Sequence, residues 1–492
     1  MNQRSSGILM HITSLPSKYG IGTFGKEAYN FIDFLKECSQ KYWQILPLNP
    51  TSYGDSPYQS FSAFAIDPYF IDFDLLLEDG LLNEEDYACV DFGKDISKVD
   101  YENIFNKKIN ILKIAFKNSK NRFLCDIEEF KAHNICWLDD YTLYMAVKEK
   151  HDLKSWKYWN NDIKFREKSA IDLYKKELKE SINYWVFVQF IAYKQWSMLK
   201  DYANNNDIKI IGDMPIYVAE DSADMWSNER LFLIDENKNS TMIAGCPPDY
   251  FCPDGQLWGN PIYDWKYIEG TGFEWWIERF RKASELYDVI RLDHFRGFES
   301  YWEIPNKETK SVNGKWVKGP GIELFNKIKD ALGDVNIIAE DLGFITKEVI
   351  DLRISLGYPG MKVLQFAFDS GKENIYLPHN YEENCVVYIG THDNETIQGW
   401  IENANKKDLD FAINYLESNK EDLNYWNFIN FALESKGKLV IIQMQDYLGL
   451  NNEARTNIPS TIGCNWTWRV KKSELTKDLA YKINEKTKYY NR

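Results

Sequence analysis

The sequence predicts a (β/α)8 barrel, in which eight parallel strands alternate with helices. Three observations favour this fold: eight short apolar runs recur along the chain, polar residues follow each run, and helical apolar patterns separate several of them. The chain has 492 residues, whereas a plain barrel of this kind needs only about 250. We therefore expect one large catalytic domain over residues 1–492, with long insertions in its barrel.

The eight runs are rich in β-branched and aromatic residues, which is typical of parallel strands buried on both faces. Their recurrence along the whole chain indicates strands of one sheet rather than isolated helices. In chain order they are GILMHIT (7–13), YWQILPLN (42–49), IKIIGDMPIYV (208–218), DVIRLDHF (288–295), VNIIAEDLG (335–343), MKVLQFAF (361–368), CVVYIGTHDN (385–394) and KLVIIQMQD (438–446).

Apolar residues at helical spacing lie between several runs, and they predict helices that cover the barrel. An open, doubly wound sheet is the alternative architecture. That alternative lacks support because no G-x-G-x-x-G or Walker-type loop follows any of the runs. The clearest helical patterns are Ala28, Phe31, Leu35 and Cys38, and then Ile322, Phe325, Ile328 and Leu332.

The uneven spacing of the runs locates the insertions. The link between the second and third runs is too long for one helix, so we expect a mostly helical insertion at 50–205. A second insertion, 214–285, follows the third strand and contains an aromatic, Gly/Pro-rich loop at 245–265, which we interpret as a lid. The aromatic side chains of this loop need a surface to pack on, which argues against disorder; they are Tyr250, Phe251, Trp258, Tyr263 and Trp265.

Charge and composition exclude several classes of ligand. The net charge is −15 and no basic block is present, so neither nucleic acid nor an anionic membrane surface is an expected partner. No apolar stretch approaches the length of a membrane span, and the N-terminus lacks the pattern of a signal peptide. The eight cysteines form no C-x-x-C pair, and we expect a reduced, cytoplasmic enzyme.

Aromatic residues make up 15% of the chain. A large core with aromatic packing is one explanation for most of them. The alternative is that some of the Trp and Tyr residues line a cleft that binds a ligand with flat apolar faces, such as a sugar chain.

Charged side chains follow several of the predicted strands, at the end of the barrel where active sites lie. They are Asp213 after the third strand, Arg291 and Asp293 on the fourth, Glu340 on the fifth, and His392 and Asp393 on the seventh. Converging carboxylates repel one another, so such a cluster indicates acid/base chemistry or metal binding.

Metal binding, with His294 and His392 as possible ligands, is the competing interpretation of this cluster. Arg291 argues against it, because it points to the same side of its strand as Asp293 and supplies positive charge there. His294 alternates to the other face, where a packed role explains it equally well. We expect no metal and no cofactor.

Seven separated motifs resemble those of the amylomaltases, 4-α-glucanotransferases of the wider α-amylase-like group, and they cover almost the whole chain. One departure lies at NIPST (457–461), where Ser460 stands in a place that the family more often fills with glycine. The motifs are GDSPYQSFSAFA (54–65), GDMPIYVAEDSADMW (212–226), the 245–261 loop, RLDHFRG (291–297), IAEDLG (338–343), GTHDNET (390–396) and GCNWTWR (463–469).

The resemblance implies a retaining double displacement on α-1,4-glucans. It implies Asp293 as nucleophile, Glu340 as general acid/base and Asp393 as the carboxylate that stabilises the transition state. Asp293 and Glu340 suit this mechanism. Retention needs one ionised and one protonated carboxyl about 5–5.5 Å apart, and neighbouring strands can place two carboxyls at that distance. Adjacent Asp341 is disfavoured as the acid because side chains alternate along a strand.

The resemblance also implies a set of substrate-binding residues. Two of them have structural alternatives: Trp258 could anchor its loop, and Asp213 could cap a helix or pair with an arginine. The set is Ser56, Tyr58, Asp213, Gln256, Trp258, Arg291, Asp369, His392 and Asn457.

The function predicted from these residues is transfer of α-1,4-glucan segments between maltooligosaccharides, which serve as donor and acceptor. A hydrolase of the same fold and a catalytically silent glucan-binding barrel are the alternatives. The silent protein is disfavoured because residues of the required type fill all three catalytic positions. Preferred chain lengths, formation of large cyclic glucans and oligomeric state stay open.

Overall fold

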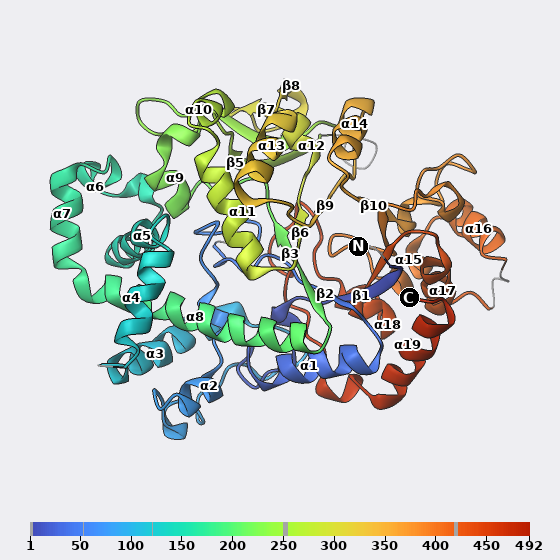
Figure 1. Ribbon diagram of the computed structural model, residues 1–492, viewed down its shortest axis with the longest axis horizontal. Coiled ribbons are helices and arrows are strands. Elements are labelled where there is room, and N and C mark those ends of the chain that lie inside the picture. The colour runs from blue at the N-terminus through green and yellow to red at the C-terminus, as the bar shows by residue number, and fades with distance from the viewer. Residues whose placement is uncertain (1–2, 53, 121, 249–253, 418–421) are drawn as a thin grey trace.

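The structure, a computed structural model, describes residues 3–52, 54–120, 122–248, 254–417 and 422–492. Its centre is a parallel sheet of eight strands in the order β10-β11-β12-β1-β2-β3-β6-β9 (Figure 1). A hydrogen bond from the Ala339 N–H to the Pro359 carbonyl (2.9 Å) joins the two ends into a nearly closed barrel. The strands are β1 (Ser5–Leu9), β2 (Tyr42–Gln44), β3 (Lys209–Met214), β6 (Val289–Leu292), β9 (Ile337–Ala339), β10 (Gly360–Val363), β11 (Cys385–Tyr388) and β12 (Leu439–Gln443).

The predicted barrel is confirmed, since each of the eight apolar runs overlaps one of these strands. Most strands are shorter than the runs, because the residues at the C-terminal end of each run turn into the loops at the barrel mouth. The barrel interior is filled by side chains that include Leu9, Ile211, Val289 and Ile338, all buried.

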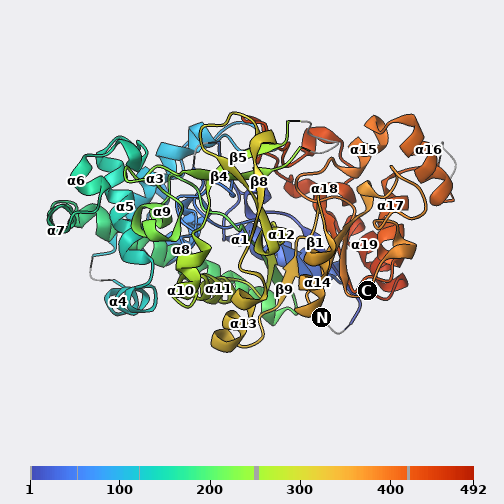
Figure 2. The ribbon, with the colours of Figure 1, turned by 90° about the horizontal axis from the view of Figure 1, so that it is seen from above.

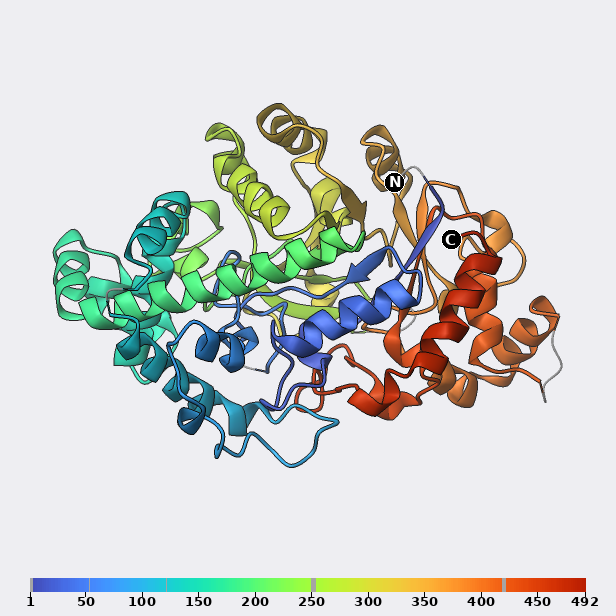
Figure 3. The ribbon, with the colours of Figure 1, turned by 60° about the horizontal axis from the view of Figure 1, so that its bottom comes forward.

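Helices cover the outside of the barrel, and α1 and α8 run side by side across it (Figure 3). The first predicted helical pattern is buried throughout in α1 and its C-cap, Cys38. The second needs a correction, because Ile322 is exposed and Leu324 is buried in its place at the start of α13. The covering helices are α1 (Lys26–Glu37), α8 (Lys179–Asn205), α11 (Glu274–Leu286), α13 (Gly321–Leu332), α14 (Lys347–Ser355), α17 (Tyr425–Glu434) and α19 (Lys477–Tyr489).

The chain between β2 and β3 is mostly helical and gathers on one side of the barrel (Figures 1 and 2). Its longest helix, α8, buries Trp185, Phe187 and Trp196, so much of the aromatic content here serves the core. The other helices of this segment are α2 (Phe73–Glu78), α3 (Tyr101–Asn118), α4 (Leu124–His133), α5 (Leu138–Lys150), α6 (Asn161–Lys164) and α7 (Lys168–Glu177).

A second, antiparallel sheet of order β5-β4-β7-β8 was not predicted. Its strands are β4 (Met242–Cys246), β5 (Gln256–Pro261), β7 (Ser300–Pro305) and β8 (Lys315–Lys318), so it joins the segments after β3 and after β6. The pairing of β4 with β7, which joins the two halves of the sheet, spans distant residues and leaves no local signal in the sequence. The sheet matters for function because β5 carries Gln256 and Trp258.

Short helices complete the fold: α9 (Ala223–Ser227), α10 (Trp265–Gly270), α12 (Arg296–Glu299), α15 (Ile397–Asn403), α16 (Lys406–Tyr415) and α18 (Met444–Tyr447). The last three lie with α17 and α19 at the opposite side of the barrel from α3–α7 (Figure 1). Within the described ranges, no helix has both the length and the apolarity needed to span a membrane.

Candidate active site

The predicted catalytic carboxylates come together where the strands end. Asp213 and Arg291 are paired across β3 and β6, and Asp293 follows β6 directly. Glu340 follows β9, and its backbone N–H donates to the Leu292 carbonyl (3.0 Å). The parallel register thus places these side chains at one barrel mouth, as sequence position alone indicated.

Arg291 is the electrostatic centre of the mouth. Its buried guanidinium donates through Nη1 to Asp213 Oδ2 (2.6 Å) and to Asp293 Oδ1 (2.9 Å). Asp213 Oδ2 also accepts a hydrogen bond from the Tyr58 hydroxyl (2.8 Å). Asp213 therefore has the arginine-pairing role that was weighed against substrate binding, and this pairing fixes Arg291 against Asp293.

Glu340 is held by two backbone donors. Its Oε2 accepts from the His294 N–H (2.7 Å) and its Oε1 from the Leu342 N–H (3.1 Å). The neighbouring Asp341 points elsewhere, as strand alternation predicts, because it forms an ion pair with Arg353 Nε (3.0 Å). Glu340 is thus the acid that shares the mouth with Asp293.

Burial raises the pKa of both Asp293 and Glu340 above the ordinary range of carboxyls. The charge of Arg291 opposes this rise in both, and its direct contact keeps the pKa of Asp293 the lower of the two. The charge of Asp293 in turn raises the pKa of Glu340. Contact with Arg291 therefore favours the ionised form of Asp293, and the charge of Asp293 favours the protonated form of Glu340.

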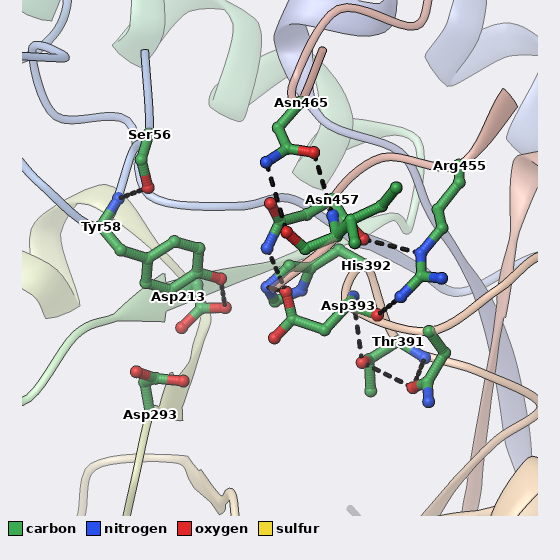
Figure 4. A network of polar contacts seen from close by, with 12 residues as sticks. Ser56, Tyr58, Asp213, Asp293, Thr391, His392, Asp393, Arg455, Asn457 and Asn465 are labelled. Atoms are coloured by element: carbon green, nitrogen blue, oxygen red, sulfur yellow. Dashed lines mark hydrogen bonds and ion pairs between the residues drawn. The ribbon is translucent and has the colours of Figure 1, made fainter. Parts of the chain in front are cut away.

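Asp393 is held at the other side of the mouth (Figure 4). Its Oδ1 accepts from Asn457 Nδ2 (2.6 Å) and lies 3.4 Å from His392 Nε2. The His392 ring stacks on Tyr58, with centroids 5.2 Å apart. Burial lowers the pKa of His392, so its imidazole is neutral near pH 7.

Trp258 packs against His294, the residue that follows Asp293 in the chain. Its ring meets that of His294 edge to face, with centroids 4.8 Å apart, and its Nε1 donates to Gln256 Oε1 (3.0 Å). The anchoring role and a role in the cleft are therefore both compatible with its position. Tyr250 and Phe251 of the same loop lie outside the described residues.

The other two predicted binding residues lie on loops. Ser56 accepts a hydrogen bond from the Tyr58 N–H (3.3 Å) through its Oγ, beside the mouth (Figure 4). Asp369 lies exposed in the loop after β10, where its Oδ1 accepts from Asn374 Nδ2 (2.9 Å). Within the described residues, Asp369 forms no hydrogen bond or ion pair with Asp293, Glu340 or Asp393.

No set of three His, Cys, Asp or Glu side chains in the described part of the chain is arranged to hold a metal ion. His294, a ligand of the metal interpretation, packs against Trp258. Burial lowers its pKa to about 3. The Arg291 guanidinium supplies positive charge at Asp213 and Asp293.

A model of the 4-alpha-glucanotransferase family matches residues 10–476 of this chain. The chain belongs to that family. It is 52% identical to a 4-alpha-glucanotransferase of Clostridium butyricum over 98% of this chain and 100% of the relative. A 4-alpha-glucanotransferase of Streptococcus pneumoniae is 48% identical over 100% of this chain and 98% of its own.

Solved structures of related proteins agree with this family assignment. The amylomaltase from Streptococcus agalactiae in complex with acarbose superposes with a TM-score of 0.97 at 44% identity, covering 100% of both chains. The amylomaltase from Corynebacterium glutamicum has the same fold, with a TM-score of 0.81 at 17% identity over 99% of this chain and 75% of its own. The family predicted from the seven motifs and the barrel predicted from the eight apolar runs are both confirmed.

Sequence reasoning gave no role to three residues that this 4-alpha-glucanotransferase places at the mouth. The Trp466 ring lies 5.9 Å from both Tyr58 and His392, and its motif, GCNWTWR, was the available signal. Arg455 donates to the Asp393 carbonyl (2.6 Å). His11 follows β1, and its Nδ1 accepts from the Leu46 N–H (3.2 Å).

Ser460, the departure from the family pattern, has a φ of 64°. Because this left-handed conformation costs a residue with a Cβ about 1–2 kcal/mol, we expect Ser460→Gly to stabilise the protein by about 1 kcal/mol. Ser460→Ala is the matched control, since it removes the hydroxyl but keeps the Cβ. Denaturant unfolding measures both; equal effects of the two variants would show that the hydroxyl, and not the backbone, matters.

Proposed function

We propose that this protein transfers α-1,4-glucan segments by double displacement through a covalent glycosyl ester on Asp293. The observation that carries the proposal is the pair of half-buried carboxyls at one barrel mouth, one held by Arg291 and the other by two backbone N–H groups. The family assignment supplies the reaction class, and the site residues supply the steps.

In the first step Asp293 attacks the anomeric carbon of the donor while Glu340 protonates the departing glycosidic oxygen. The Asp293–carbon bond forms as the glycosidic bond breaks, with inversion at that carbon. Arg291 keeps Asp293 ionised for this attack, and the raised pKa of Glu340 keeps its proton available.

In the second step Glu340, now ionised, takes the proton of an acceptor hydroxyl. The acceptor oxygen attacks the anomeric carbon and releases Asp293, and the second inversion restores the original configuration. Asp393 stabilises both transition states by accepting hydrogen bonds from sugar hydroxyls. Asp213 acts through Arg291. The glucan is bound by the remaining residues of the set: Ser56, Tyr58, Gln256, Trp258, Asp369, His392 and Asn457.

The substrates that fit this site are maltooligosaccharides and other α-1,4-glucans. The acarbose held by the relative from Streptococcus agalactiae supports a ligand of this kind. Free cysteines in the described part of the chain support a reducing compartment, the cytoplasm; they include Cys38, Cys89, Cys125, Cys136, Cys385 and Cys464.

Two measurements test the proposal. Incubation with maltotriose should yield a ladder of longer and shorter maltooligosaccharides with little net gain of reducing ends. Mass spectrometry of rapidly quenched enzyme should find a glycosyl ester on the peptide that contains Asp293. A simple release of reducing ends would favour the hydrolase, and absence of both products would favour a silent binding protein.

Transfer competes with water, and we expect Trp258 to help decide the outcome. A held acceptor has an effective molarity of up to about 10⁵–10⁸ M in the best-oriented cases, and closed loops exclude water from such intermediates. Trp258→Ala should lower transfer and raise the ratio of hydrolysis to transfer. The released glucose equivalents measure hydrolysis and the redistribution of chain lengths measures transfer, so the two together give this ratio.

Trp426→Ala is the control for the Trp258 prediction. This half-buried tryptophan lies on α17 and packs on Tyr447. Its loss should lower stability without changing the ratio. If Trp258→Ala lowers both reactions equally, Trp258 is a binding or packing residue only.

A further inference from the structure

Asp393 is held in place by the chain segment 455–457 as well as by its own loop (Figure 4). Arg455 makes two of the contacts: its Nη2 donates to the Asp393 carbonyl (2.6 Å) and its Nε donates to the Asn457 carbonyl (2.8 Å). Two donors of one rigid guanidinium thus fix the backbone of Asp393 relative to that of Asn457.

Asn457 completes the connection. Its backbone N–H donates to the His392 carbonyl (3.1 Å), and its Nδ2 donates to Asp393 Oδ1 (2.6 Å). The contacts form a closed ring from Arg455 to the Asp393 backbone, through the Asp393 carboxylate to Asn457, and back to Arg455. The orientation of the carboxylate therefore depends on a residue that does not touch it.

Hydrogen bonds on both sides of Arg455 hold its backbone in place. The preceding Ala454 carbonyl and the following Thr456 hydroxyl both accept hydrogen bonds from Gln445 Nε2, at 3.2 and 2.9 Å. Burial lowers the pKa of the Arg455 guanidinium and the charges of Glu395 and Asp393 oppose this, and an arginine stays charged near pH 7. Hydrogen bonds from a charged donor are roughly twice as strong as neutral ones, so Arg455 is suited to hold two carbonyls.

We propose that Arg455 is a positioning residue that sets the orientation of the Asp393 carboxylate for the transition state. The inference rests on the proposed function, in which Asp393 acts on sugar hydroxyls. An interaction that operates mainly in the transition state affects kcat more than KM. A displacement of about 1 Å in a catalytic group costs on the order of 100-fold in rate.

The test compares Arg455→Met, Arg455→Lys and Arg4→Met in maltotriose transfer. Arg4 is the matched control, because its Nη1 also donates to a carbonyl, that of Ser435 (2.7 Å), away from the mouth. We expect Arg455→Met to lower kcat by about 10–100-fold with KM within about twofold. Arg455→Lys should recover only part of this loss, since one ammonium does not reproduce the fork, and Arg4→Met should keep both constants.

A double-mutant cycle with Asp393→Asn identifies the route of the effect. The donor is α-maltotriosyl fluoride, whose leaving group needs no proton, so that weak activities are measurable. If Arg455 acts through Asp393, Arg455→Met should cost little in a protein that already carries Asp393→Asn. Additive losses, or a change in KM alone, would overturn the inference.

Detection of the ester on Asp293, measured beside kcat, separates this inference from the proposed function. A wild-type enzyme that forms no ester on Asp293 would refute the mechanism whatever Arg455 does. An ester that forms normally, together with full kcat in Arg455→Met, would refute only the positioning role. Should Arg455→Met not fold, Arg455→Lys gives the same comparison, because it retains the charge and loses one donor.

Discussion

Asp293→Ala is expected to abolish transfer, with a loss in kcat/KM greater than the ~10²–10⁴-fold typical of a general acid or base. The reason is that no covalent intermediate forms without the nucleophile. The fold should persist, because Arg291 keeps Asp213 as a partner and the mouth loses one of its repelling carboxylates. Maltotriose redistribution measures the rate, and thermal unfolding checks the fold.

Azide gives the Asp293 prediction a stereochemical readout. In Asp293→Ala, azide should replace the carboxylate, attack the anomeric carbon of α-maltotriosyl fluoride and expel fluoride with one inversion. The product is the β-azide. An α-azide, or a variant that retains more than a trace of activity without azide, would contradict the assignment of Asp293.

Glu340→Ala is expected to show the second-largest loss, about 10²–10⁴-fold with maltotriose, or roughly 3–5 kcal/mol of barrier. The loss should nearly vanish for the first step with α-maltotriosyl fluoride, because fluoride leaves without a proton. Azide should then attack the ester on Asp293, and this second inversion yields the α-azide. Opposite anomers from the two variants would assign the two roles separately.

The pH profile provides a further check on Glu340. Its pKa is raised by burial, so the proton is bound below that pKa and lost as the pH rises through it. Wild-type transfer should therefore fall on the alkaline side, and this fall should be absent from Glu340→Ala with the fluoride donor. Asp341→Asn is the control: it breaks the ion pair with Arg353, so it should lower stability and leave the alkaline fall in place.

Much of the fold could be predicted because its signals are local. A strand buried on both faces reads as a continuous apolar run, and each of the eight runs overlaps a strand. The helix register was less certain, as Ile322 shows: a pattern of apolar residues does not say which turn of α13 first reaches the barrel. The antiparallel sheet left no such signal because β4 and β7 are far apart in sequence.

The candidate site, like the fold, was predictable in part from the sequence. Sequence position alone brought Asp213, Arg291, Asp293 and Glu340 to one barrel mouth, because parallel strands end on the same side. It could not say which hydrogen bonds these side chains make. The pairing of Asp213 with Arg291 became evident only from the distance between their side chains.

The sequence by itself determined the barrel, the family resemblance and the identity of the carboxylates, because these depend on residue type and chain order. Only the tertiary structure decided which groups hold the two carboxyls, Arg291 for Asp293 and two backbone N–H groups for Glu340, since these contacts depend on three-dimensional surroundings. The same holds for Arg455, which lies 62 residues from Asp393 in the chain. Hydrogen bonds between distant segments have no periodicity that a sequence could reveal.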